Sequence, residues 1–338
     1  MYEASFFCFF YLKPLLKPNA NYAIFFNWSL FFHEMKRRRR MNMNTTALLI
    51  GLCPVIGWGL FPTVAAKIGG RPVNQILGTT LGTFIFALIF SLVTKTALPE
   101  GKDLLFSILS GVGWASAQII TFKSFDLVGT SKALPITTAV QLLVTSLWGA
   151  FFLGDWPGIS NKLIGIFALI LIVIGARLTV WAEEKDDKDS ALLKRAIFLL
   201  VIGGFGYWAY SAAPQATTID GMTSFLPQAI GMLLVASIYS AFLSVTEKEE
   251  KSAFLEKVSY LQIFSGFFFA FAALTYLISA QSNMNGLATA FILSQTSVVI
   301  GTLTGIYFLG QKKTKKEMKV TLFGLVLIIL AATMTVMI

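Results

Sequence analysis

Acidic residues and histidine are missing from the long apolar segments of this sequence. Only 13% of its 338 residues are charged, whereas a soluble domain of this size has about 25%. The acids fall in connecting segments or near the N-terminus, and the single histidine is His33. A charge at the centre of a bilayer costs on the order of 3 kcal/mol on insertion scales and usually marks function. Its absence favours a protein that handles neutral polar molecules over one that handles cations, anions or electrons.

Cysteine is equally sparse. Cys8 lies near the N-terminus and Cys53 in the first apolar segment, so no disulfide framework is expected. With one histidine in the chain, we expect neither a metal site built on His and Cys nor histidine acid–base chemistry. The connections between apolar segments are too short to hold a soluble catalytic domain. An enzyme is therefore not expected.

Long apolar segments are what the sequence does contain. They run for about 20 residues, the length a helix needs to cross roughly 30 Å of hydrocarbon. We predict an all-α integral membrane protein with ten transmembrane helices in the lipid bilayer. The predicted spans are 46–65, 74–94, 104–122, 133–152, 161–180, 196–213, 223–245, 258–279, 286–308 and 320–337.

Several stretches of the chain occur twice in the same order. The matching pairs are 149–154 with 305–310, 167–176 with 323–332, Ser110-Gly111 with Ser265-Gly266, and Gln75 and Gly78 with Gln228 and Gly231. Each predicted half has an odd number of spans, so the halves must have opposite orientations in the membrane. Two inverted five-helix repeats are the plan of many secondary transporters, with substrate near the midplane. We predict repeat 1 at 43–181 and repeat 2 at 182–338; chance similarity of Leu-rich helices is the alternative.

The positive charges are unevenly distributed over the connections. Seventeen of the twenty Lys and Arg after residue 41 lie in or beside the first, third, fifth, seventh and ninth connections. The positive-inside rule places these in the cytoplasm and both termini outside. Such scattered charge does not indicate a nucleic-acid partner. Residues 1–42, which contain the basic run 36–40, are predicted to be a non-structural extension; a membrane-surface segment is the alternative.

Buried amides and aromatic residues are the candidates for binding. An amide in hydrocarbon without a partner costs several kcal/mol, so it bonds to another helix or faces a wet cavity. Amides donate and accept, which suits sugar hydroxyls, and indole faces can stack on a sugar ring. Glycines and prolines near residues 57–62 and 206–214 indicate gating elements or close helix packing. The predicted substrate-binding residues are Trp58, Gln118, Gln141, Trp208, Tyr210 and Gln295.

Coupling to an ion is harder to assign because no span holds a carboxylate. If protons drive transport, the candidates are the acids at span edges, Asp126, Asp155 and Asp220. A solvated loop acid is the alternative for each of them.

The chain resembles the glucose/ribose porter family of the drug/metabolite transporter superfamily. The stretches that carry this resemblance are 57–62 (GWGLFP), 67–70 (KIGG), 75–82 (QILGTTLG), 119–123, 206–215 and 283–289. The resemblance covers about 43–338. It implies ten helices, no ligated cofactor and proton-linked import of a sugar across the bacterial cytoplasmic membrane, with ribose as the expected sugar. Glucose uptake and export of a metabolite or drug are the alternatives, and the oligomeric state is left open.

Overall fold

The computed structural model describes residues 45–153, 158–183, 187–217, 219–246, 251–279, 294 and 296–336. The chain separates into two units, 1–43 and 44–338, and the described residues all belong to the second. Within these ranges the secondary structure is helical and there is no strand. The predicted N-terminal extension, 1–42, lies outside the described residues.

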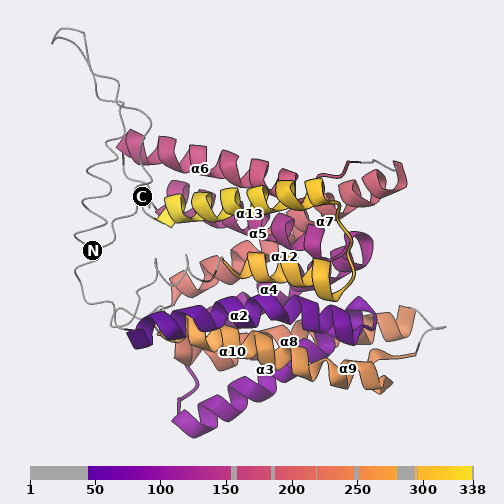
Figure 1. Ribbon diagram of the computed structural model, residues 1–338. Helices are drawn as coiled ribbons and strands as arrows, with labels where there is room; N and C mark the ends of the chain where they lie inside the picture. The colour runs from indigo at the N-terminus through magenta and orange to yellow at the C-terminus, as the bar shows by residue number, and fades with distance from the viewer. Residues whose placement is uncertain are drawn as a thin grey trace, which may run out of the picture. The chain divides into compact units, whose positions relative to one another are not determined.

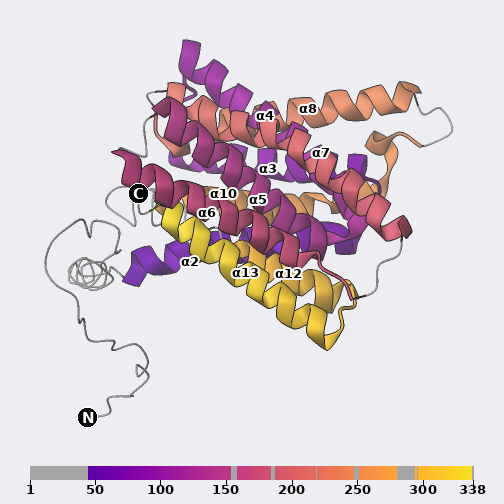
Figure 2. The same ribbon diagram turned by 90° about the horizontal axis from the view of Figure 1, so that it is seen from above.

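The described helices follow one another along the chain (Figures 1 and 2). They are α2 (Thr45–Ile68), α3 (Pro72–Thr94), α4 (Gly101–Val128), α5 (Thr130–Trp148) with a π-helical turn (Gly149–Leu153), α6 (Gly158–Thr179), α7 (Asp187–Ala212) with a 3₁₀ turn (Ala213–Ala216), α8 (Gly221–Thr246), a 3₁₀ turn (Ala253–Leu255), α9 (Lys257–Leu261), α10 (Ile263–Ser279), α12 (Ser297–Phe308) and α13 (Lys315–Val336).

Nine of the described helical segments are long and apolar enough to cross a membrane, and α12 is a shorter apolar helix. Each predicted span has a described counterpart, with α9 and α10 together forming the eighth. The ninth predicted span, 286–308, is described only from Ser297 as a helix. Large apolar side chains such as Leu92 and Phe205 are about 70% exposed on these helices, as expected for surfaces that face lipid tails. The chain is a multi-pass membrane protein.

Two helices extend well beyond their predicted spans. α4 continues to Val128 and α7 begins at Asp187, so charged residues that hydropathy assigns to connections form helical turns at the bundle ends. One residue, Gly129, joins α4 to α5, and its φ of 78° is a conformation that side chains with a Cβ rarely adopt. The sharp reversal therefore depends on glycine at this position.

Small residues set the closest helix contacts. α4 packs against α7 where Gly113 meets Gly206, and α10 packs against α2 where Gly57 meets Ala272. A Cβ on Gly206 would lie 2.5 Å from the carbonyl oxygen of Gly113. Lipid tails are as apolar as leucine, so membrane helices associate through this kind of close packing. These contacts pair α4 closely with α7 and α10 closely with α2.

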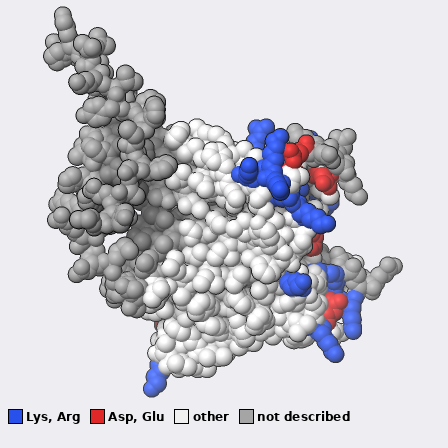
Figure 3. All heavy atoms as spheres, viewed as in Figure 1, with Lys and Arg blue, Asp and Glu red and all other residues white. Residues whose placement is uncertain are grey.

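Charged side chains gather at one end of the bundle, beside the connections that join α2 to α3, α6 to α7 and α12 to α13 (Figures 1 and 3). The rest of the visible described surface in this view is mainly uncharged. We call this the charged end. It contains the connections that the positive-inside rule assigns to the cytoplasm.

Candidate functional site

Aromatic side chains fill the centre where α2, α4, α7 and α10 meet. The rings of Trp114 on α4 and Phe269 on α10 have centroids 4.2 Å apart. Phe61 on α2 lies 5.9 Å from Phe122 and 5.6 Å from Phe269. All four side chains are buried and belong to one hydrophobic cluster. The more accessible Trp58 and Tyr210 pack against this cluster.

Three further aromatic residues lie in this region but keep accessible surface. Trp58, Tyr210 and Tyr276 are only half-buried, although Tyr210 and Tyr276 are deep in the bundle. The rings of Trp58 and Tyr276 have centroids 5.4 Å apart. The indole N–H of Trp58 is buried and has no acceptor among the described residues. Deep, partly accessible side chains with an unpaired donor are what a site for a polar molecule requires.

A chain of hydrogen bonds lies across the α4–α7 contact. The Tyr207 hydroxyl donates to Oε1 of Gln118 at 3.0 Å and lies 3.0 Å from the Thr121 hydroxyl. Each of these three side chains is at most 5% exposed. Gln118 was predicted from the sequence as a binding residue, whereas Tyr207, Thr121 and Tyr276 were missed. Only knowledge of which helix faces lie against one another would have identified these three residues as candidates.

The other predicted binding residues lie elsewhere. Trp208 packs edge to face on Trp148 of α5, with centroids 5.0 Å apart. Gln141 is half-buried on α5, and Gln295 lies outside the described residues. Of the six predicted residues, the structure therefore brings Trp58, Gln118 and Tyr210 to the centre.

Several of the buried amides hold helices together. Gln262, at the break between α9 and α10, donates 2.8 Å hydrogen bonds to the carbonyls of Ala65 and Gly69 at the end of α2. Gln75 donates to a carbonyl in the preceding turn, and Gln228 to a serine on its own helix. Gln262 thus bonds to another helix, the alternative that the sequence left open, whereas the N–H groups of Gln75 and Gln228 bond locally. The side-chain oxygens of Gln75 and Gln262 are buried without a partner among the described residues.

The predicted coupling acids are at the edges of the bundle. Asp126 is exposed in the last turn of α4. Asp220 is exposed and its carboxylate accepts a 2.8 Å bond from the amide of Thr223, which caps the start of α8. Asp155 lies outside the described residues. Among the described residues, no group of three His, Cys, Asp or Glu side chains is placed to hold a metal ion.

A polar network that sequence reasoning missed connects the start of α3 to the start of α9 at the charged end. Glu256 accepts hydrogen bonds from Arg71, at 3.0 Å, and from Asn74, and Asn74 also donates to Ser259 at 2.9 Å. Burial acts to raise the pKa of Glu256, but the bonds from Asn74 and Arg71 and the charges of Arg71 and Lys251 outweigh it and lower the pKa. The carboxylate therefore stays ionised and ties two connections together.

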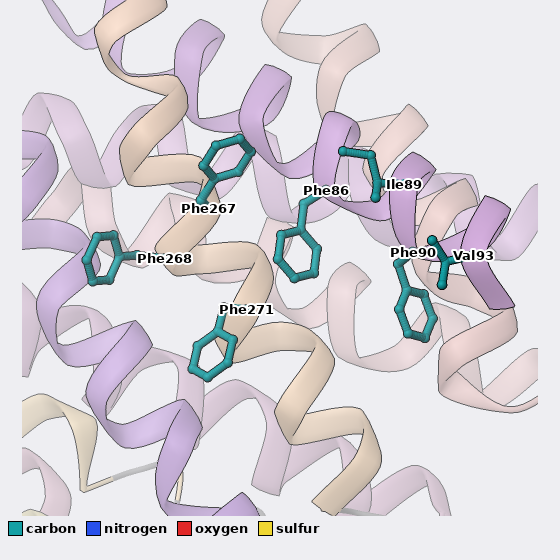
Figure 4. A pocket seen from close by; sticks show the side chains of 7 residues that line it. All are labelled: Phe86, Ile89, Phe90, Val93, Phe267, Phe268 and Phe271. Carbon is teal, nitrogen blue, oxygen red and sulfur yellow. The ribbon is translucent and has the colours of Figure 1, made fainter.

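One groove on the described part of the chain lies apart from the polar centre. Its volume is about 660 Å³ and it lies between α3 and α10 (Figure 4). The lining residues are Phe86, Ile89, Phe90, Val93, Phe267, Phe268 and Phe271. These side chains offer no hydrogen-bonding groups, so the groove does not suit a hydrophilic molecule.

Comparison with known proteins identifies the family. A family profile described as "Sugar transport protein" matches residues 49–338. The chain belongs to this sugar transport family. Membership agrees with the resemblance seen in the sequence and indicates a transporter rather than an enzyme.

Relatives of this sugar transport chain carry a more specific name. Proteins named "Putative ribose uptake protein RbsU" from Enterococcus faecalis, Lactobacillus johnsonii and Staphylococcus aureus (strain Mu50) are 69%, 67% and 62% identical to it. Each alignment covers 88% of this chain and the whole relative. A crystal structure of a protein 14% identical superposes with a TM-score of 0.55, over 86% of this chain and 97% of that chain. At that identity the likeness establishes a shared fold alone.

Proposed function

We propose that this family member imports a neutral sugar, ribose, across the bacterial cytoplasmic membrane. The observation that carries the proposal is the aromatic centre, where Trp58, Tyr210 and Tyr276 keep accessible surface and α4 contributes the amide of Gln118, which bonds to Tyr207. It combines flat apolar rings with uncharged hydrogen-bonding groups, as a sugar needs. The names of the bacterial relatives support ribose and import.

We infer that transport proceeds by alternating access between two inverted repeats, 43–181 and 182–338. The contact of Gly57 with Ala272 has a counterpart in the contact of Gly206 with Ala117. The spacing from Ala117 to Ala272 equals that from Ser110 to Ser265, which the sequence repeat already pairs. The helix contacts between the two halves also correspond: α4 of the first half packs on α7 and α8 of the second, and α10 of the second half packs on α2 and α3 of the first. These correspondences support a two-fold relation between the halves.

In this proposal the charged end faces the cytoplasm, and the network of Arg71, Asn74 and Glu256 helps to close that side. Trp58 and Tyr210 contact the sugar ring and Gln118 a hydroxyl group. Trp208, Gln141 and Gln295 stay proposed contacts on the pathway. For proton coupling, Asp126, Asp155 and Asp220 stay the candidates.

Counterflow in proteoliposomes tests the substrate independently of the coupling ion. Vesicles loaded with unlabelled ribose should accumulate external labelled ribose above protein-free vesicles, and unlabelled glucose should compete less well than ribose. Gln118→Ala should weaken the signal. Gln75→Ala is the matched control, because it removes a buried amide whose bond lies in the turn before α3. Absence of ribose counterflow in the parent protein would refute the proposed substrate, and glucose counterflow alone would favour the glucose alternative.

The direction of ribose transport and its coupling to protons need separate measurements. Cells that express the protein should take up labelled ribose, and an uncoupler should reduce this uptake if protons drive it. Uptake that an uncoupler leaves unchanged would contradict proton coupling. Faster loss of preloaded ribose without any uptake would favour an exporter.

A further inference from the structure

The two sides of the centre differ chemically although they occupy corresponding places in the proposed repeat. On one side, Trp58 of α2 packs on Tyr276 of α10, ring on ring. On the other side, Tyr207 of α7 bonds to Thr121 and Gln118 of α4. Tyr276 follows Thr121 by the same number of residues as Ser265 follows Ser110. Tyr276 and Thr121 therefore occupy corresponding places in the proposed repeat. One side thus offers aromatic faces where the other offers hydrogen bonds, and we call them the aromatic wall and the hydrogen-bonding wall.

Tyr207 determines which atoms of Gln118 remain available. Its hydroxyl donates to Oε1 of Gln118, so the acceptor end of the amide is occupied. The Thr121 hydroxyl lies 3.0 Å from the tyrosine oxygen and can alternatively donate to the carbonyl of Ala117. A tyrosine hydroxyl has one proton, so while it is donated to Gln118 the Thr121 hydroxyl supplies the bond that Tyr207 accepts. Both N–H groups of the Gln118 amide are left for another acceptor.

The aromatic wall has complementary properties. Trp58 and Tyr276 are half-buried, so both rings keep some accessible surface. The buried indole N–H of Trp58 lacks an acceptor among the described residues, and a buried donor left unpaired is costly. A sugar has apolar C–H faces and acceptor oxygens, and it can satisfy both walls only in a limited set of orientations.

We propose that the sugar is held in one orientation, between the aromatic wall of Trp58 and Tyr276 and the amide N–H groups of Gln118, and that Tyr207 is the positioning residue that keeps this amide turned toward the sugar. The inference deepens the proposed function and rests on it. It assigns Tyr207 a role in discrimination among sugars, since the amide can rotate once the phenolic hydroxyl is removed.

The test compares ribose with a series of monodeoxyriboses, each lacking one hydroxyl, as competitors in ribose counterflow. The parent protein should bind one deoxy analogue about five- to tenfold more weakly than ribose, the effect of one lost hydrogen bond. Tyr207→Phe, which keeps the ring, should reduce that ratio toward one by weakening ribose alone. Gln118→Ala should do the same. Trp58→Phe should weaken ribose and the analogues, because it removes part of the aromatic wall, and the loss should be smaller only for an analogue that lacks the oxygen facing the indole N–H.

Tyr239→Phe is the control, because it removes a phenolic hydroxyl from α8 at a ring that lies under the Lys123 ammonium. It should leave every ratio unchanged. All variants are compared at equal amounts of monodisperse protein. A Tyr207→Phe protein that weakens ribose and every analogue equally, or that changes nothing, would overturn the positioning role while ribose counterflow by the parent still supports the proposed function. A parent protein without ribose counterflow would overturn both.

Discussion

The contact between Gly206 and Gly113 provides a sharp test of how the centre is held together. A Cβ at position 206 would lie 2.5 Å from the carbonyl oxygen of Gly113, 3.0 Å from the Cβ of Ala117 and 3.1 Å from its amide nitrogen. None of these atoms can move by rotating a side chain. Because non-bonded atoms prefer about 3.5–4.0 Å, Gly206→Ala should separate α7 from α4 by about 1 Å.

The consequences for stability and binding follow from that separation. Overpacking a tight contact costs about 1–3 kcal/mol, and the better helix propensity of alanine returns up to about 1 kcal/mol. The net loss of up to about 2 kcal/mol should lower the melting temperature by up to ~8 °C. The hydrogen bond from Tyr207 to Gln118 is 3.0 Å long. A shift of this size would break it, because a separation of about 3.6 Å is no longer a hydrogen bond.

Gly203→Ala is the matched control on the same helix. Its Cβ would meet Ile120 at 3.4–3.6 Å, an ordinary contact, so its melting temperature should equal or exceed that of the parent protein. Thermal unfolding in one detergent, followed by size-exclusion chromatography, measures both variants, and ribose competition measures affinity. Equal stability and equal affinity of the two variants would refute the close-contact reasoning.

Three further outcomes follow from the charged end. Glu256→Gln should cost about 1 kcal/mol or less at low salt, because its ion pair with Arg71 is partly exposed, and the difference should vanish in 1 M NaCl; a salt-independent loss would contradict this. Gln262→Leu removes two buried hydrogen bonds and should cost about 1–3 kcal/mol in thermal unfolding, so an unchanged melting temperature would count against their role. Burial lowers the pKa of Lys313 from 10.5 to about 8, against the opposing charge of Glu317. The unfolded chain then binds more protons above pH 8, and stability should rise between pH 8 and 10.5 relative to Lys313→Met; parallel curves would refute this.

The membrane architecture was predictable because it depends on a property that is local in sequence. Apolar runs of about 20 residues locate the helices, since each run must cover the hydrocarbon thickness by itself. The absence of acids and histidine from these runs is enough to favour a neutral polar substrate. Helix ends were less predictable. α4 and α7 continue past their apolar runs because charged residues can form helical turns beyond the hydrocarbon.

The sequence could not decide which polar residues share the centre. Gln118 and Gln262 look alike as buried amides, yet one bonds to Tyr207 across the α4–α7 contact and the other bonds to the end of α2. In a soluble helix the apolar stripe shows which side faces inward, but a membrane helix is apolar toward lipid and toward protein alike, so its rotation leaves little trace in the pattern. Here that rotation is set by close contacts such as Gly206 against Gly113. The sequence alone determined a multi-pass helical protein suited to a neutral polar substrate, and the packing between helices decided which side chains meet.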